Sequence, residues 1–151
     1  MTTGATKKIL YATDYSKASA RALDEAVRLA RQNDAELLVV HVIEPVTPYV
    51  TGEDFGSAEL YMKLEETTKK EAEFSMNKLL DKLQTSKVKA KGLLLKGTPD
   101  EQIVNTAKRR NADLIVIGTH GRTGLSKLFM GSVAGKVVST ANCPVLTVRG
   151  R

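Results

Sequence analysis

Residue types that suit phosphate binding gather in one short segment of this 151-residue chain. In order they are Gly118, Gly121, Arg122, Gly124, Lys127, Gly131 and Ser132. Because glycine has no Cβ, backbone N–H groups there can approach phosphate oxygens closely and form an anion-binding concavity. Gly131 and Ser132 open a predicted helix, whose N-terminal amides and dipole favour an anion. The segment therefore predicts a site for a small polyphosphate; the alternative is a connection whose glycines only make turns.

Two standard nucleotide-binding motifs do not match this segment. Residues 131–136 lack the four-residue gap between glycines, and the Ser or Thr after the lysine, that define a Walker A loop. The spacing is also not G-x-G-x-x-G, and the segment follows the fourth apolar run of the chain rather than the first. Both motifs are therefore excluded.

A second candidate for ligand binding is Asp14, which directly follows the first apolar run and precedes a predicted helix. Its carboxylate could bind a ribose hydroxyl, a base edge or a metal-bound water. The alternative is that Asp14 caps the helix or makes an Asx turn. Ser16 is a competing N-cap, which would leave Asp14 for the ligand.

Five apolar, β-branched runs alternate with helical patterns along the chain. The runs span residues 8–13, 36–42, 88–95, 114–118 and 144–148. Helical patterns occupy residues 16–32, 58–84, the stretch after Thr98, and about residues 131–141. This alternation predicts an α/β fold with a parallel sheet and helices on both faces, and no linker divides residues 1–151, so we expect one domain. The ligand crevice of such a sheet lies beyond the carboxyl ends of the strands, where the winding reverses.

Composition narrows the classes of function. Lysine and arginine total 23 against 17 acidic residues, and the net charge of +6 suits an anionic partner without naming it. A single cysteine excludes a disulfide framework and a thiolate metal cluster. The N-terminus lacks the pattern of a signal peptide, and no apolar run approaches the ~20 residues that cross a bilayer. We therefore expect a soluble, cytoplasmic protein that does not bind membranes.

Other reactive side chains have ordinary interpretations. His120 could act as a base or touch a phosphate, but a solvated loop histidine is the more common case. His41 is interpreted as a packing or hydrogen-bonded residue, and Cys143 as a buried, inert thiol. The long connection at residues 44–57 either forms part of a ligand site or is a plain surface loop.

The glycine spacing and the apolar runs share their pattern with a known family. Gly118, Gly121 and Gly131-Ser132 match the G-x2-G-x9-G-(S/T) signature of the ATP-binding branch of the universal stress protein family. Residues 8–16, 38–42, 112–118 and 143–148 resemble the family's first, second, fourth and closing strands. The resemblance covers essentially the whole chain.

This resemblance implies an open, twisted, Rossmann-like sheet of five parallel strands in the order 3-2-1-4-5. It also implies a cofactor, ATP, with ADP and AMP as alternatives, and Mg²⁺ or Mn²⁺ held through the phosphates. The residues expected to bind it are Ala12, Thr13, Asp14, Val42, Gly118, Gly121, Arg122, Gly124, Gly131, Ser132 and Val133. Ala12 stands where many ATP-binding members have proline, which gives the pocket a smaller wall. The family usually forms homodimers through the last strand, here residues 145–148.

Three functions remain open from the sequence. The favoured one is a nucleotide-dependent regulatory protein of the stress response, with at most slow ATP hydrolysis and no assigned catalytic residue. The second is a low-activity ATPase or nucleotidyl-transfer enzyme, although no base or charge clamp is placed convincingly. The third, a nucleic-acid binder, is disfavoured because helix-turn-helix, RNP-like and clustered basic patterns are missing.

Overall fold

The computed structural model describes residues 4–45, 57–120 and 130–150. Strands and helices alternate along the chain, and each expected element is found with its ends within one residue of the predicted ones, except that the end of the helix after Thr98 was not predicted. The elements are β1 (Lys8–Ala12), α1 (Lys17–Asn33), β2 (Glu36–Ile43), α2 (Ser57–Gln84), β3 (Lys89–Lys96), α3 (Pro99–Arg109), β4 (Leu114–Gly118), α4 (Ser132–Thr140) and β5 (Val145–Val148). Among the described residues, no helix is both long and apolar enough to cross a bilayer.

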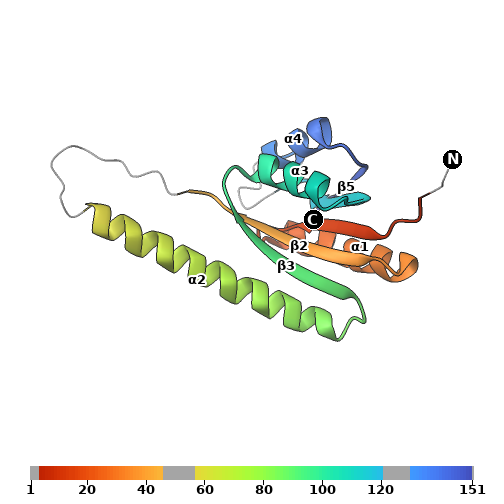
Figure 1. Ribbon diagram of the computed structural model, residues 1–151, viewed down its shortest axis with the longest axis horizontal. Helices are drawn as coiled ribbons and strands as arrows, with labels where there is room; N and C mark the ends of the chain where they lie inside the picture. The colour runs from red at the N-terminus through yellow and green to blue at the C-terminus, as the bar shows by residue number, and fades with distance from the viewer. Residues whose placement is uncertain (1–3, 46–56, 121–129, 151) are drawn as a thin grey trace.

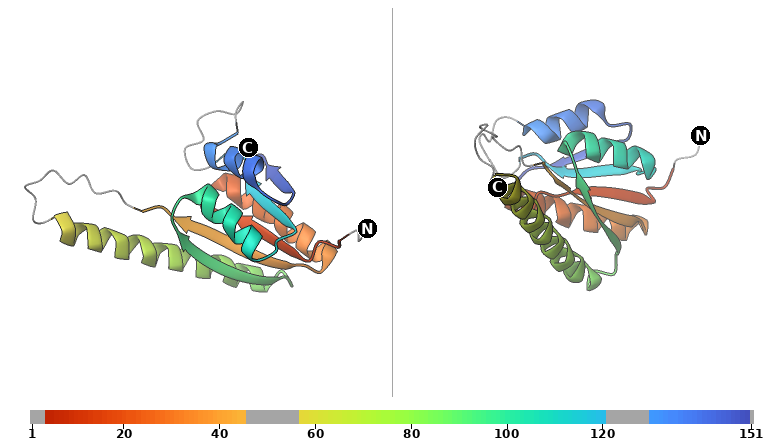
Figure 2. Two further views of the ribbon diagram at one scale, coloured as in Figure 1. Left: turned by 45° about the horizontal axis from the view of Figure 1, so that its top comes forward. Right: turned by 60° about the vertical axis from the view of Figure 1, so that its left-hand side comes forward.

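The five strands form one parallel sheet in the order β3-β2-β1-β4-β5 (Figure 1), which confirms the predicted topology. Strand β1 lies at the centre and pairs with β2 on one side and with β4 on the other. The chain therefore first winds outward from β1 to one edge and then returns to build the other half. Helices α1 and α2 cover one face and α3 and α4 the other (Figure 2).

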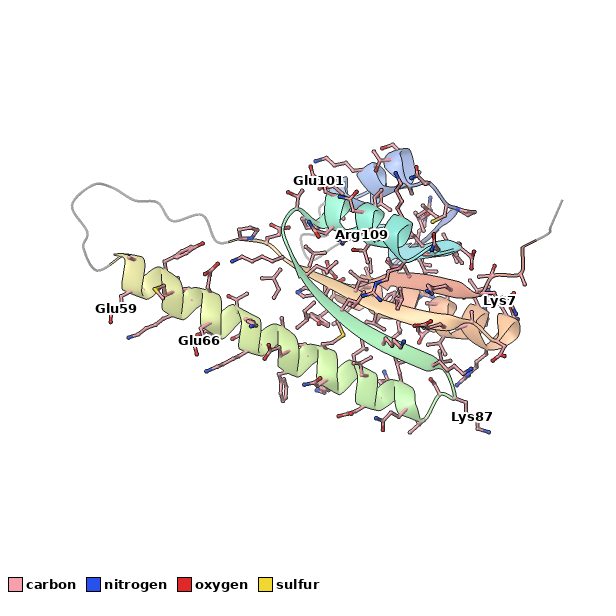
Figure 3. The ribbon with its side chains drawn as sticks, in the orientation of Figure 1. Lys7, Glu59, Glu66, Lys87, Glu101 and Arg109 are labelled. Carbon is pink, nitrogen blue, oxygen red and sulfur yellow. The ribbon has the colours of Figure 1, made fainter. Side chains whose placement is uncertain are left out.

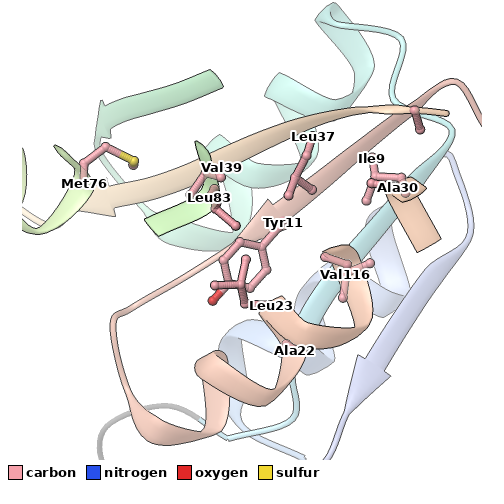
Figure 4. Close-up of a cluster of buried hydrophobic side chains, with 12 residues drawn as sticks. Ile9, Tyr11, Ala22, Leu23, Ala30, Leu37, Val39, Met76, Leu83 and Val116 are labelled. Carbon is pink, nitrogen blue, oxygen red and sulfur yellow. The ribbon is translucent and has the colours of Figure 1, made fainter. Parts of the chain in front are cut away.

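The core consists of two apolar layers, one on each face of the sheet. Side chains alternate along β1, so that Ile9 and Tyr11 pack toward α1 and α2 while Leu10 and Ala12 pack toward α3 and α4. Figure 4 shows the first layer, in which Tyr11 lies among side chains from the sheet, α1 and α2. Burial on both faces explains why the central runs are apolar almost without interruption.

Small side chains allow α1 to approach the sheet closely. Ala22, Ala26 and Ala30 are buried against it, as their helical spacing predicts. At the first turn of α1, a Cβ built on Gly118 would lie 3.3 Å from both the carbonyl carbon and the carbonyl oxygen of Ala18. The absent side chain of Gly118 is therefore required by helix packing, in addition to any role toward a ligand.

We predict that Gly118→Ala lowers the free energy of unfolding by about 1–3 kcal/mol, the usual cost of adding a methyl group to a filled space. The matched control is Gly135→Ala, because a Cβ on Gly135 meets nothing within 4 Å and alanine suits the α4 helix better. Urea denaturation of both variants measures the effect. A Gly118→Ala protein as stable as the parent would show that α1 does not pack this tightly.

Candidate functional site

A cavity of about 370 Å³ opens at the carboxyl ends of β1, β2 and β4, where the winding of the sheet reverses. All the predicted binding residues that the structure describes line it. They are Ala12, Thr13, Asp14, Val42, Gly118, Gly131, Ser132 and Val133. Gly121, Arg122, Gly124 and Lys127 lie outside the described residues. The chain thus brings together residues up to 121 positions apart in sequence, since parallel strands all end at the same edge.

Hydrogen bonds within the β1–α1 turn hold Asp14 beside the cavity. Its Oδ1 accepts from the backbone N–H of Ser16 at 2.9 Å, which forms an Asx turn. The hydroxyl of Ser16 in turn accepts from the N–H of Ser19 at 3.2 Å and caps α1. Ser16 is therefore the N-cap, and Asp14 makes an Asx turn while it lines the cavity. Ligand binding by the Asp14 carboxylate stays a prediction.

Tyr15 occupies the left-handed region of the backbone, with φ of 61°. Such a conformation is unfavourable for a residue with a Cβ and persists only where neighbours impose it. Here the N–H of Tyr15 donates to Thr13 Oγ1 at 2.9 Å, and its ring lies 4.5 Å from that of His41. Burial raises the pKa of the Tyr15 phenol to about 12, so the ring remains neutral.

His41 is hydrogen-bonded, as the sequence predicts. Its Nδ1 lies 2.8 Å from the carbonyl oxygen of Thr13. A carbonyl only accepts, so Nδ1 carries the proton and donates this bond. The imidazole thereby links the end of β1 to β2 and braces the turn that carries Asp14.

The backbone of Thr119 joins three segments at the opposite wall of the cavity. Its N–H donates to the carbonyl of Val148 at 2.9 Å, and its carbonyl accepts from the N–H of Gly131 at 2.6 Å. The second bond places the start of α4 beside the end of β4. Gly131 is the N-cap and Ser132 the first, exposed residue of α4. The first N–H groups of the helix have no acceptor within it, so they can bind an anion in the cavity.

His120 differs from its predicted environment. Its Nδ1 lies 2.9 Å from Thr119 Oγ1, while Nε2 is buried and has no hydrogen-bond partner among the described residues. The interpretation as a solvated loop histidine therefore holds only in part: the residue is half-buried, and its Nε2 is shielded from solvent. A buried imidazole nitrogen beside a cavity is able to bond to a bound molecule, because leaving it unpaired costs free energy.

Several lining residues escaped the sequence analysis. Val40, Ile103, Ile117 and Ala134 contribute apolar surface, and Ser19, Thr119 and Glu44 add polar atoms. The sequence contains a signal for Thr119, because it is a polar residue directly after a buried strand. It contains no such signal for Ile103, because α3 reaches the site only when the chain folds. Cys143 is half-buried, and burial raises the pKa of its thiol, which suits an unreactive group.

The described lining residues include no lysine or arginine, so an anion bound there would be held by backbone amides and a metal ion rather than by cationic side chains. Among them the carboxylates of Asp14 and Glu44 are the only groups with full charge. Within the described residues no group of three or more His, Cys, Asp or Glu could hold a metal ion alone. A divalent ion at this site would therefore take most of its ligands from a bound phosphate group and water.

Comparison with known proteins gives a consistent result over the length of the chain. The model of the Universal stress protein family matches residues 5–149. A universal stress protein of Thermus aquaticus is 42% identical over 143 residues, which are 95% of this chain and 98% of that protein. The structure of universal stress protein UspA from Lactobacillus plantarum matches with a TM-score of 0.85 at 25% identity, over 97% of this chain and 99% of that one. A universal stress protein from Archaeoglobus fulgidus, solved in complex with dAMP, matches with a TM-score of 0.60 at 25% identity, over 96% of this chain and 99% of that one.

Two helix starts allow a controlled test of the turn that carries Asp14. Ser16 caps α1 with its side chain, whereas Thr98 precedes α3 without a side-chain capping bond. We predict that Ser16→Ala lowers the free energy of unfolding by about 1 kcal/mol. Thr98→Ala should change it much less. Equal losses in chemical denaturation would show that the Ser16 hydroxyl does not hold this turn.

Proposed function

This chain belongs to the universal stress protein family, and on that premise we propose that it binds an adenine nucleotide in the cavity between β1 and β4. ATP is the proposed ligand, with ADP and AMP as alternatives. The observation that carries the proposal is the convergence of the eight described binding residues on one cavity. Its volume, about 370 Å³, falls in the range of small-molecule sites. A relative in complex with dAMP supports the same class of ligand.

In the proposed complex the base lies against the apolar surface from β2 and β4. The backbone of Val42 meets the adenine edge, and the carboxylate of Asp14 lies at the nucleoside end. The phosphates lie at the first turn of α4, where Gly131 leaves room for them and Ser132 adds a hydroxyl donor. Arg122 and Lys127, which lie outside the described residues, are expected from the sequence to supply positive charge. Mg²⁺ or Mn²⁺, when bound, neutralises phosphate oxygens.

We assign the nucleotide a regulatory role rather than a catalytic one. Efficient phosphoryl transfer needs cationic clamps and a group that orients the nucleophile. The described cavity wall offers two carboxylates and two imidazoles, and the candidate cations Arg122 and Lys127 lie outside the described residues. None of these groups is assigned as a clamp or as the group that orients the nucleophile. Nucleotide occupancy would then switch the shape of the protein or its partners during the stress response. In this proposal the protein is cytoplasmic, and its single domain spans residues 1–151, which the family match over residues 5–149 supports.

The proposed homodimer uses β5, the four-residue strand at the edge of the sheet. Val145–Val148 pairs with β4 on one side. All four residues are half-buried in the single chain. An unpaired edge offers backbone N–H and C=O groups to a second strand, and a two-fold axis there makes the contact with the same surface of each copy.

A second candidate function is slow ATP hydrolysis or nucleotidyl transfer. The observation that favours it is the buried Nε2 of His120, which could orient a water or accept its proton. Hydrolysis and regulation are compatible where turnover is slow.

The binding proposal predicts that Gly131→Val weakens ATP binding at least tenfold in titration calorimetry with Mg²⁺ present. A branched side chain there would stand where the phosphates approach. Gly131 has φ of −58°, which valine tolerates, and valine keeps the N–H that bonds to Thr119. The control is Gly135→Ala, which should bind as the parent does. Unchanged affinity of a folded Gly131→Val protein contradicts the proposed phosphate position.

The regulatory proposal predicts steady-state ATP hydrolysis well below the roughly 1–100 s⁻¹ of kinases. Phosphate release by the purified protein, with and without Mg²⁺, measures it. A rate within that range that Ser132→Ala abolishes would replace the regulatory assignment with an enzymatic one. His120→Asn then separates catalysis from binding, since it should lower the rate without loss of the nucleotide.

A further inference from the structure

Helix α2 exposes large apolar side chains on the side that the core does not use. Its inner side packs on the sheet through Met76 and Leu83, which are buried. Leu60, Leu64 and Phe74 are instead 60%, 47% and 71% exposed. Single exposed apolar residues are common, but a group on one helix marks an interaction surface more often. The first turns of α2 also extend past the sheet (Figure 1).

These side chains form a stripe. At 3.6 residues per turn, Leu60, Leu64, Thr67 and Phe74 fall within about 80° of the helix circumference. Leu60, Thr67 and Phe74 are spaced by seven residues, so they follow one another along the axis. Glu59 and Glu66 (labelled in Figure 3) flank the stripe and line the hollow between α2 and β3, whereas none of the four stripe residues lines it. The stripe is therefore open to a partner over about four turns of helix.

The charged residues beside the stripe are arranged so that this face of α2 is complementary to the same face of an antiparallel copy. Lys63 and Glu71 each lie four residues from Thr67, on opposite sides, and Leu60 and Phe74 each lie seven residues from it. Ion pairs along this helix between described residues, Lys70 with Glu66 and Lys96 with Glu65, involve neither Lys63 nor Glu71.

We propose that this face of α2 binds the same face of a second copy, antiparallel, about a two-fold axis at Thr67. Leu60 then packs against the partner's Phe74, and Lys63 pairs with the partner's Glu71, each contact occurring twice by symmetry. The short side chain of Thr67 at the crossing point lets the helices approach closely. The opposite charges fix the antiparallel register, because a parallel pair would place Lys63 against Lys63.

This surface is distinct from the proposed β5 dimer and does not depend on a nucleotide. Strand β3, which packs against α2, and strand β5 form opposite edges of the sheet. A chain that uses both surfaces associates in two separate steps and builds assemblies larger than a dimer.

Charge exchange tests the register. Lys63→Glu or Glu71→Lys alone creates two repulsive pairs and should weaken one association step by about tenfold or more at low ionic strength. The double variant Lys63→Glu with Glu71→Lys restores both pairs and should return that step to within about threefold of the parent. Sedimentation velocity measures each step. If the double variant associates no more strongly than either single variant, the proposed register is wrong. If neither single change affects association, the proposed surface is wrong.

Cross-linking tests the axis independently. In a Cys143→Ser background, Thr67→Cys places two thiols together at the axis, and mild oxidation should yield a disulfide-linked dimer. The control is Asn77→Cys, equally exposed but about 30 Å from its symmetry mate at 1.5 Å per residue. Cross-linking of position 67 but not 77 supports the proposal. Equal cross-linking at both positions, or none at 67, overturns it.

Discussion

The hydrogen bond from the N–H of Gly131 to the carbonyl of Thr119, at 2.6 Å, is the contact on which the candidate site depends. It joins the N-terminus of α4 to the end of β4. The N–H of Thr119 bonds to Val148 at the same point, so α4, β4 and β5 are fixed together. Together with the packing of Ala134 and Val137 in the second core layer, this contact fixes the first turn of α4 relative to β1 and β2 and completes one wall of the cavity.

The second wall depends on how closely α1 approaches the sheet. Alanines along α1 and the missing side chain of Gly118 bring its first turn against β4. The turn before α1 is held by side-chain bonds from Thr13, Asp14 and Ser16 and is braced by His41. The same backbone geometry therefore supplies both the packing and the polar edge of the cavity. At Gly118, close helix packing leaves little room for a side chain at a residue that also lines the cavity.

The sequence predicted the fold almost completely, because its central runs are buried on both faces and carry few polar residues. Strand β4 was placed to the residue, and the glycine spacing, with the family resemblance it carries, pointed to residues that line one cavity in the structure. The burial of His120 Nε2 could not be predicted, since the sequence around it carries no apolar period that would show it. Ile103 was missed because α3 reaches the site only when the chain folds. The exposure of Leu60 and Phe74 was equally hidden, because a helical pattern does not show where the sheet ends.

The central claim is that a nucleotide binds with its phosphates at the first turn of α4 and its nucleoside against β1 and β2. Titration of the ¹⁵N-labelled protein with ATP and Mg²⁺, followed by amide chemical shifts, tests it most directly. We expect the largest changes at Gly131, Ser132 and Val133, with smaller ones at Thr13 and Val42. An absence of changes, or changes confined to α2 and β3, would contradict the assignment of this cavity as the nucleotide site.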